Sequence, residues 1–229
     1  MTASSSGIGE HGAQEAPAAP PIAGQVFGDA LPLAEAYVAM LASAGVTRGL
    51  IGPREVPRLW ERHVLNSAAV AEAVAPGARV VDVGSGAGLP GVPLGLARRD
   101  VRLTLVEPMA RRVEFLEEVV GAVAEPAGLS WRVVRGRAED RSVAGLVGAV
   151  DVVTARAVAP LPRLVGWCRG LLRPGSRLVA LVGSRALAEL PALIPELEAA
   201  GMRDIHPRAV GAELGEAATT VVVMTRGAP

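Results

Sequence analysis

The sequence contains no lysine, a single cysteine and only three histidines. Cys168 alone excludes an internal disulfide framework, and the scattered histidines do not have the ligand spacing of a metal site. We therefore expect no metal, and the cysteine content indicates a reducing, cytoplasmic location. All 23 basic residues are arginine, and alanine, glycine, valine and proline are abundant. This bias indicates a GC-rich genome and not a functional choice of guanidinium.

The chain also lacks a charge excess, a long apolar run and a secretion signal. Its 23 arginines balance 23 acidic residues, so no overall field indicates a nucleic-acid-binding protein. Half of the residues are apolar, yet no run approaches the roughly 18–20 uninterrupted apolar residues of a membrane-spanning helix. The first residues lack the basic-then-apolar layout of a signal peptide. We expect no membrane partner.

Composition divides the chain into three parts. Residues 1–28 are rich in alanine, glycine, serine and proline, which predicts a disordered tail. Residues 29–77 carry apolar side chains at helical spacing and predict a helical extension of two helices. Residues 78–229 alternate short apolar runs with amphipathic ones and predict an α/β domain large enough to bury a core.

The alternation in the third part predicts seven strands and five helices. The expected strands are 79–84, 102–107, 130–135, 150–155, 177–182, 202–208 and 219–226. The expected helices are 90–98, 109–121, 139–147, 160–172 and 186–200. Strands that alternate with helices form a mostly parallel, doubly wound sheet of Rossmann-like type, with helices on both faces.

The most informative stretch joins the first expected strand to the next helix and has the sequence VVDVGSGAGLPG. Glycine stands at every second position of the turn, at Gly84, Gly86 and Gly88, which lets the backbone approach a ligand closely. Asp82 precedes the first glycine by two residues, and Leu89 stands where a dinucleotide-binding turn has its third glycine. The pattern D-x-G-x-G-x-G resembles the first motif of class I methyltransferases that use S-adenosylmethionine. The alternative is a purely structural glycine turn.

Polar side chains follow the next three strands at the edge where open α/β sheets bind ligands. Glu107 ends the second strand and is expected to accept hydrogen bonds from both ribose hydroxyls of an adenosine, the alternative being an exposed acid that starts a helix. Glu139 follows the third strand and is expected at the adenine amino edge, unless it caps a helix. Arg156 lies just past the fourth strand and could pair with a cofactor carboxylate or an RNA phosphate, or with a neighbouring acid.

The second helix of the extension carries candidate RNA contacts. Arg54, Arg58 and Arg62 recur every four residues and would give one basic face, which either binds phosphate or is simply solvated. His63 and Asn66 on the same helix either face the substrate or fill and cap the structure.

Missing motifs narrow the chemistry. The loop after the fourth strand, ARAVAP, lacks the Asn/Asp-Pro-Pro-aromatic motif of enzymes that methylate exocyclic amines. Methylation of pyrimidine carbon 5 needs an activated cysteine, whereas Cys168 is expected in mid-helix as a small apolar residue. Guanine N7 carries a lone pair and no proton, so its methylation needs alignment and no general base. We therefore assign no catalytic residue.

Together these segments resemble the RsmG family, also called glucose-inhibited division protein B, over about residues 30–226, and the composition indicates a member of actinobacterial type. The resemblance rests on the motifs WERHVLNS from Trp60, VDVGSGAGLPGVPL from Val81, RRVEFL from Arg111, ARA from Ala155 and GWC from Gly166. It implies S-adenosylmethionine-dependent methylation of guanine N7 in the 530 loop of 16S rRNA, by a monomer that acts on the 30S subunit or an assembly intermediate.

The resemblance also implies site residues. The family's cofactor positions fall on Gly84, Leu89, Ala138, Glu139 and Arg156.

One position departs from the family pattern. After the fifth strand the family usually has a lysine, where this chain has Val182, so an RNA contact there is lost or is supplied by Arg185. Two other functions therefore stay open: a small-molecule methyltransferase on the same fold, and a cofactor-binding ribosome-assembly module without transfer activity.

Overall fold

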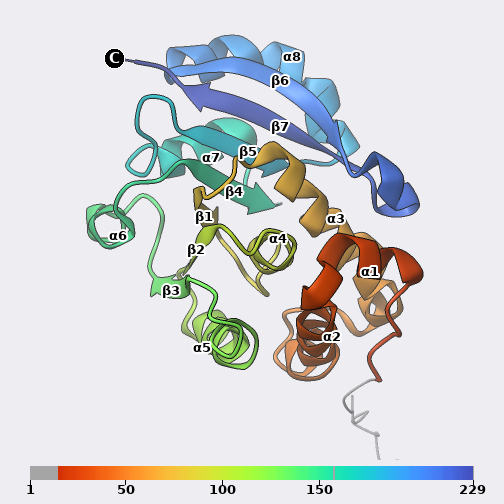
Figure 1. The fold of residues 1–229 in the computed structure, drawn as a ribbon. Coiled ribbons are helices and arrows are strands. Elements are labelled where there is room, and N and C mark those ends of the chain that lie inside the picture. Colours follow the sequence, from red (N-terminus) through yellow and green to blue (C-terminus); the bar gives the residue numbers. More distant parts are fainter. Residues whose placement is uncertain (1–14, 157, 229) are drawn as a thin grey trace, which may run out of the picture.

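The centre of the fold is a seven-stranded sheet with the strand order β3-β2-β1-β4-β5-β7-β6 (Figure 1). The computed structural model describes residues 15–156 and 158–228. The strands are β1 Arg79–Val83, β2 Arg102–Glu107, β3 Trp131–Arg135, β4 Val152–Arg156, β5 Arg177–Leu181, β6 Met202–Val210 and β7 Thr219–Arg226. Only β7 runs antiparallel to its two neighbours. The predicted Rossmann-like fold class and all seven predicted strands are confirmed.

Helices connect the strands and precede the sheet. Those of the N-terminal region are α1 Pro21–Phe27, η1 Gly28–Ala30, α2 Leu31–Met40, η2 Leu41–Gly45, η3 Pro53–Arg58, η4 Leu59–Leu65, α3 Asn66–Ala68 and η5 Ala69–Ala73. Those between strands are α4 Gly91–Ala97, α5 Ala110–Val119 with η6 Val120–Ala124, α6 Arg141–Val147, α7 Leu161–Cys168, α8 Ser184–Ala199 and η7 Ala212–Ala217.

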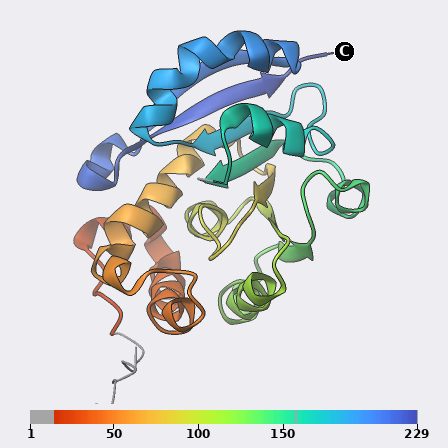
Figure 2. The same ribbon diagram turned by 180° about the vertical axis from the view of Figure 1, so that it is seen from behind.

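The two faces of the sheet bury separate apolar clusters. On one face, strand residues such as Val80 and Leu103 pack under the N-terminal helices, α4 and α5. On the other face, strand residues such as Val81 and Val153 pack under α6, α7 and α8, which Figure 2 shows from behind. Because successive strand residues point to opposite faces, a strand that is covered on both sides must be apolar throughout, which explains the continuous apolar runs in the sequence.

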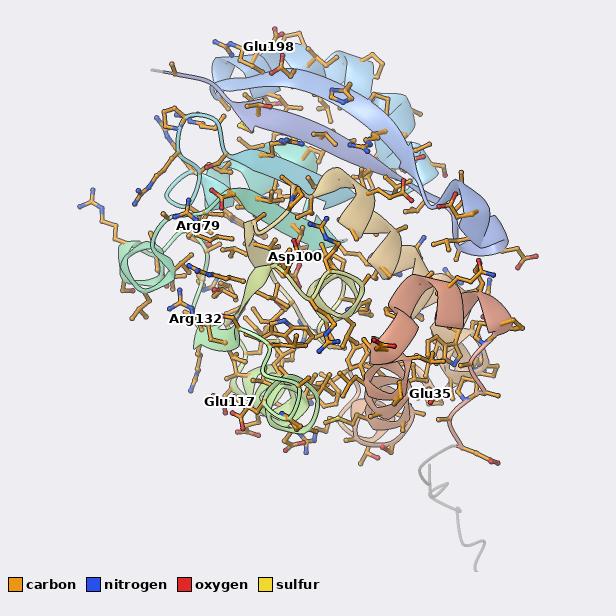
Figure 3. All side chains as sticks on the ribbon, in the orientation of Figure 1. Glu35, Arg79, Asp100, Glu117, Arg132 and Glu198 are labelled. Atoms are coloured by element: carbon orange, nitrogen blue, oxygen red, sulfur yellow. The ribbon has the colours of Figure 1, made fainter. Side chains whose placement is uncertain are left out.

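Charged side chains mostly lie outside these clusters. Glu35 on α2, Glu117 on α5 and Glu198 on α8 are exposed on the outer faces of their helices (Figure 3). Arg79 and Arg132 lie at the edge where the parallel strands begin. The opposite edge, where these strands end, includes the crevice between β1 and β4, at which the strand order reverses. Ligands of open α/β sheets bind at such a crevice.

The predicted disordered tail over residues 1–28 is wrong for its second half. Residues 21–27 form α1, in which Phe27 is 5% exposed. The Phe27 ring lies 6.4 Å from the Trp60 ring, and Trp60 Nε1 donates a hydrogen bond to the carbonyl oxygen of Pro17 at 2.9 Å. The physical reason is that Phe27 and Ala23 supply the apolar surface that composition averaged over 28 residues conceals. Residues 1–14 lie outside the described residues.

The helical region Pro21–Gly45 is long and apolar enough to cross a membrane by length and composition alone. In this fold Tyr37, Val38 and Leu41 of that region are buried in the core on the α4 face of the sheet. A core helix passes the same test of length and composition, so the apolar character of this region is explained by its packing.

Phe27→Ala tests whether α1 belongs to the core. Truncating a buried phenylalanine should lower the free energy of unfolding by about 3–5 kcal/mol, because apolar burial is lost and a cavity remains. Urea unfolding monitored by circular dichroism measures this loss. Gln25→Ala, which alters an exposed residue of the same helix, should leave the midpoint nearly unchanged. Equal midpoints for the two variants would show that α1 does not stabilise the fold.

Candidate cofactor and substrate site

The glycine turn after β1 lies at the crevice between β1 and β4. Gly84, Gly86 and Gly88 have φ values of +68°, +58° and +98°, a region of backbone conformation that favours glycine. A Cβ atom on Gly84 would stand 2.5 Å from Cγ1 of Val158, so that position also lacks space for a side chain. The turn therefore keeps its backbone close to the groove that it borders.

Asp82 supports this turn from inside the protein. Its side chain is fully buried, Oδ1 accepts a hydrogen bond from Thr154 Oγ1 at 2.9 Å, and Oδ2 accepts one from the Gly91 amide at 3.3 Å. The hydroxyl of Ser85 donates to the backbone carbonyl of Asp82 at 2.9 Å. One carboxyl group thus joins β1, β4 and the start of α4, and it lies behind the surface that a ligand would touch.

Burial raises the pKa of Asp82 to about 7, and the negative charge of Glu107 contributes in the same direction. The hydrogen bonds from Thr154 and Gly91 oppose this shift without cancelling it. A buried acid of this kind is protonated below neutral pH, when it can donate to Thr154 Oγ1 and still accept from Gly91.

Tyr37 of α2 holds the other side of the turn. Its hydroxyl is fully buried and donates to the carbonyl oxygen of Ala87 at 2.8 Å. Burial raises the pKa of Tyr37 well above its ordinary value. This contact was not predicted from the sequence, although Tyr37 is the only tyrosine of the chain and lies on a helix whose other inward positions are apolar.

A first groove, of about 380 Å³, lies along the carboxyl ends of β1, β2, β3 and β4. Its lining includes five of the predicted cofactor residues: Gly84, Glu107, Ala138, Glu139 and Arg156. It also includes Met109, Val158 and Trp167, which the sequence analysis did not assign to the site.

The other four predicted residues do not line the first groove. Asp82, Gly86 and Gly88 form or support the glycine turn, and the side chain of Leu89 packs against the cluster under α4.

Glu107 connects the second strand with the glycine turn. Its side chain is 1% exposed, Oε2 accepts a hydrogen bond from the Gly86 amide, and Oε1 accepts one from the Met109 amide, both at 3.0 Å. Arg112 Nη1 lies 3.8 Å from Oε2. The alternative of an exposed acid is therefore wrong. An ionised carboxylate has about four lone-pair sites, so two remain for other donors.

These residues fit an adenosine. The free lone pairs of Glu107 suit a pair of ribose hydroxyls, and the exposed side chain of Met109, with Val158 and Trp167, offers apolar contact. Ala138 is buried in the wall, while the exposed Glu139, 3.9 Å from Arg137, lies at the rim. Asp140, and not Glu139, stands at the N-cap of α6.

Arg156 lies at the end of β4 and contacts the N-terminal helices. Its Nη1 donates to Ser67 Oγ and its Nη2 to the carbonyl oxygen of Arg62, both at 2.9 Å. Burial lowers the pKa of this guanidinium. An ion pair between Arg156 and a neighbouring acid, the alternative from the sequence, does not form among the described residues.

His63 extends this network to Glu55. Nδ1 of His63 lies 3.3 Å from Arg156 Nη2, and Nε2 lies 2.9 Å from Glu55 Oε2. Because a guanidinium can only donate, Nδ1 must accept, and the proton on Nε2 is donated to Glu55. Burial is the largest of the effects that lower the pKa of His63, which favours this neutral imidazole. Both ring nitrogens are therefore engaged.

A second groove, of about 400 Å³, adjoins the first groove through Arg156. Its other lining residues are Arg58, Glu61, Arg62, Asn66 and Glu216. Two predicted RNA contacts, Arg62 and Asn66, therefore line this groove, and His63 lies against it through Arg156.

Arg185 is not brought to the second groove. Its side chain is 91% exposed at the start of α8 and pairs with Glu189 at 2.9 Å. Val182, the departure from the family pattern, packs against the cluster on the α7 face of the sheet.

Cys168 is fully buried in α7, and burial raises the pKa of its thiol to about 12. The thiol therefore stays protonated at neutral pH and is not an activated nucleophile. The prediction of a small buried residue is confirmed.

Residues 30–213 match the family model for GidB, rRNA small subunit methyltransferase G. The chain belongs to this family. It is 53% identical to a ribosomal RNA small subunit methyltransferase G of Mycobacterium sp. (strain KMS) over 212 residues, which cover 93% of this chain and 92% of the relative. It is 52% identical to the protein of that name from Salinispora arenicola over 208 residues, covering 88% of this chain and 84% of the relative.

Solved structures share the fold at low sequence identity. Aeropyrum pernix fibrillarin, with natively bound S-adenosylmethionine, has a TM-score of 0.51 and 19% identity, covering 70% of this chain and 76% of its own. An O-methyltransferase family protein from Burkholderia thailandensis has a TM-score of 0.53 and 15% identity, covering 89% of this chain and 62% of its own. The fold is that of the class I methyltransferases, with an added N-terminal helical region.

Asp82→Asn tests the buried carboxyl group, because the amide has the shape of the protonated acid. Between pH 4 and about 7 the folded protein keeps the Asp82 proton that the unfolded chain has lost, so raising the pH destabilises the wild type. The variant has no such proton. Its stability relative to the wild type should therefore rise with pH over this range, by on the order of 3–4 kcal/mol.

Urea unfolding at pH 4 and pH 7 measures this difference. Asp29→Asn, at an exposed position on η1, is the matched control and should give curves parallel to the wild type. If Asp82→Asn also runs parallel to the wild type, the carboxyl group is ionised throughout, and its proposed pKa is wrong.

Glu107→Ala tests the first groove. A hydrogen bond to a charged group contributes roughly 1.5–3 kcal/mol, so the affinity for S-adenosylhomocysteine should fall about ten- to a hundredfold. Isothermal titration calorimetry measures the affinity, and circular dichroism checks that the fold survives loss of the contacts to Gly86 and Met109. Glu114→Ala, an exposed acid on α5, should bind as the wild type does. Unchanged affinity in a folded Glu107→Ala protein would remove Glu107 from the site.

Proposed function

We propose that this protein transfers a methyl group from S-adenosylmethionine to N7 of a guanine in the 530 loop of 16S rRNA. Membership of the rRNA small subunit methyltransferase G family supports the general part of this proposal, which is methylation of small-subunit rRNA. The choice of guanine N7 and of this loop is the part that we add, from the sequence motifs and from the chemistry of the site.

The observation that carries this choice is the junction of the two grooves at Arg156. A donor site and an acceptor site must meet where the methyl group passes, and Arg156 lines both grooves. The histidine at this junction, His63, has both ring nitrogens engaged, with Arg156 and with Glu55. It is therefore not available as a general base, which suits an acceptor atom that has no proton to lose.

The chemistry needs alignment above all. Bound S-adenosylmethionine supplies a methyl group made electrophilic by its sulfonium. The lone pair of guanine N7 forms the new C–N bond while the C–S bond breaks with its electron pair going to sulfur, so the positive charge passes to the purine and no proton moves. Glu107 and the glycine turn would hold the adenosine, while Arg156, fixed by Ser67 and the helix carbonyls, would orient the groups at the junction.

The wider setting follows from the same proposal. The RNA is 16S rRNA within the 30S subunit or an assembly intermediate, the enzyme acts as a monomer, and the reaction takes place in the cytoplasm without a membrane partner. Arg62 and Asn66 in the second groove would contact this RNA, and His63 would act through Arg156. Arg185 would contribute only from outside the two grooves, since it lines neither of them.

The mechanism is tested by single-turnover methyl transfer to 30S subunits from cells that lack this gene. With no proton removed, the rate at saturating cofactor should show no log-linear rise between about pH 6.5 and 8.5. The modified position is mapped by borohydride–aniline cleavage, which is selective for N7-methylguanine. Arg156→Ala should lower the rate, and added buffer base should not restore it.

Three outcomes would contradict the proposal in different ways. A rate that rises tenfold per pH unit, or a product that resists the cleavage, overturns the assignment to N7. Transfer to a small molecule but not to 30S subunits favours the small-molecule alternative. Tight binding of S-adenosylhomocysteine without transfer to any subunit favours an assembly module.

A further inference from the structure

We propose that the second groove binds the target guanine and that the carboxylate of Glu216 recognises its Watson–Crick edge. This inference rests on the proposed function and deepens it, because it assigns the base-binding site and a specificity residue. Glu216 would accept hydrogen bonds from N1–H and from the N2 amino group, which directs N7 away from Glu216 and towards Arg156 and the first groove.

The second groove has the size and position that such a base requires. Its volume of about 400 Å³ falls within the range of ligand pockets, and it shares the lining residue Arg156 with the first groove. Its walls come from segments far apart in the sequence: η3, η4 and the start of α3, the end of β4, and η7. In Figures 1 and 2 the blue helical turn before β7 lies beside the helical region that contains α3.

A direct hydrogen bond fixes the η7 wall. Asn66 Nδ2 donates to the carbonyl oxygen of Ala217 at 3.2 Å, and Ala217 is buried. Gly215, on the other side of Glu216, has a φ of +57°, a conformation that favours glycine. Glu216 is exposed next to the buried Ala217. The Asn66 contact therefore holds the η7 backbone beside the groove, while the Glu216 side chain is exposed to solvent.

Glu61 is the other carboxylate of the second groove, and its setting differs. It lies between Arg58 and Arg62 in the sequence, and both of these arginines also line the groove, so cations of its own segment stand on the same wall. Among the described residues, Glu216 is the only one of η7 that lines the second groove. We therefore assign recognition of the base to Glu216, and contacts with flanking phosphates to Arg58 and Arg62.

The chemistry of guanine matches a carboxylate. N1–H and the N2 amino group are two adjacent donors on one edge, whereas O6 and N7 are acceptors on the edge that the major groove exposes. The two oxygens of a carboxylate accept from two such donors at once, and adenine lacks this pair. Transfer leaves a positive charge on the purine, so a nearby carboxylate also stabilises the charge that develops in the transition state.

Glu216→Gln tests this assignment in the full-length enzyme. The amide keeps the size of the side chain but replaces one acceptor with a donor. Single-turnover transfer to 30S subunits should slow about ten- to a hundredfold, the range expected for loss of a two-point base contact. The affinity for S-adenosylhomocysteine should stay within about twofold of the wild type, because Glu216 does not line the first groove. Glu213→Gln, an exposed acid of the same helical turn outside the second groove, is the control.

A substituted base tests the same contact from the RNA side. In reconstituted 30S subunits, inosine at the mapped target position keeps N1–H and N7 but lacks the N2 amino group. The wild type should methylate this RNA more slowly than the guanosine form by about tenfold. Glu216→Gln should discriminate much less between the two, since the partner of the amino group is already lost.

Each result decides a separate point. If the wild type makes no N7-methylguanine, the proposed function fails and this inference with it. If the wild type does make it, equal rates for Glu216→Gln and Glu213→Gln overturn the role of Glu216. Should Glu216→Gln not fold, equal rates of the wild type on inosine and guanosine subunits overturn the contact independently.

Discussion

The constraint on which this site depends is a buried carboxyl group, that of Asp82, which pairs with no cation among the residues that the structure describes. Asp82 joins β1 to β4 through Thr154 and to the start of α4 through Gly91. These contacts fix the glycine turn at the point where the strand order reverses. The Gly86 amide of this turn donates a hydrogen bond to the carboxylate of Glu107. Burial of an acid without a counterion costs stability, which raises its pKa to about 7. The buried carboxyl group thus lowers the stability of the fold at the crevice between β1 and β4, where a ligand site requires a rigid backbone.

The N-terminal helices are part of the site as well as a cover for the sheet. Tyr37 bonds to the glycine turn, and the helix carbonyls, Ser67 and His63 orient Arg156. The same helices form one wall of the second groove, so both grooves depend on one set of contacts. Under the proposed function, displacement of these helices would disturb cofactor and acceptor binding together.

The main elements could be predicted because their signals are local. Continuous apolar runs marked the strands that are covered on both faces, and the glycine turn combined an apolar strand with a conformational requirement. Glu107 and Arg156 could be assigned to the crevice because parallel strands end at one edge. The tail boundary was wrong because α1 is stabilised by Trp60, which lies more than thirty residues away in the chain. Arg185 did not reach the other candidates, since it pairs with Glu189 along its own helix.

By itself, the sequence determined the fold class, the positions of the seven strands along the chain and the place of the glycine turn, because apolar periodicity and backbone conformation act between near neighbours. Only the tertiary structure decided which polar side chains meet. Glu55, His63 and Arg156 form one hydrogen-bonded chain. Glu216 lines one groove together with Asn66 and Arg62, although Arg62 and Glu216 are 154 positions apart in the sequence. Such contacts depend on the packing of whole elements, and no local pattern of residues records that packing.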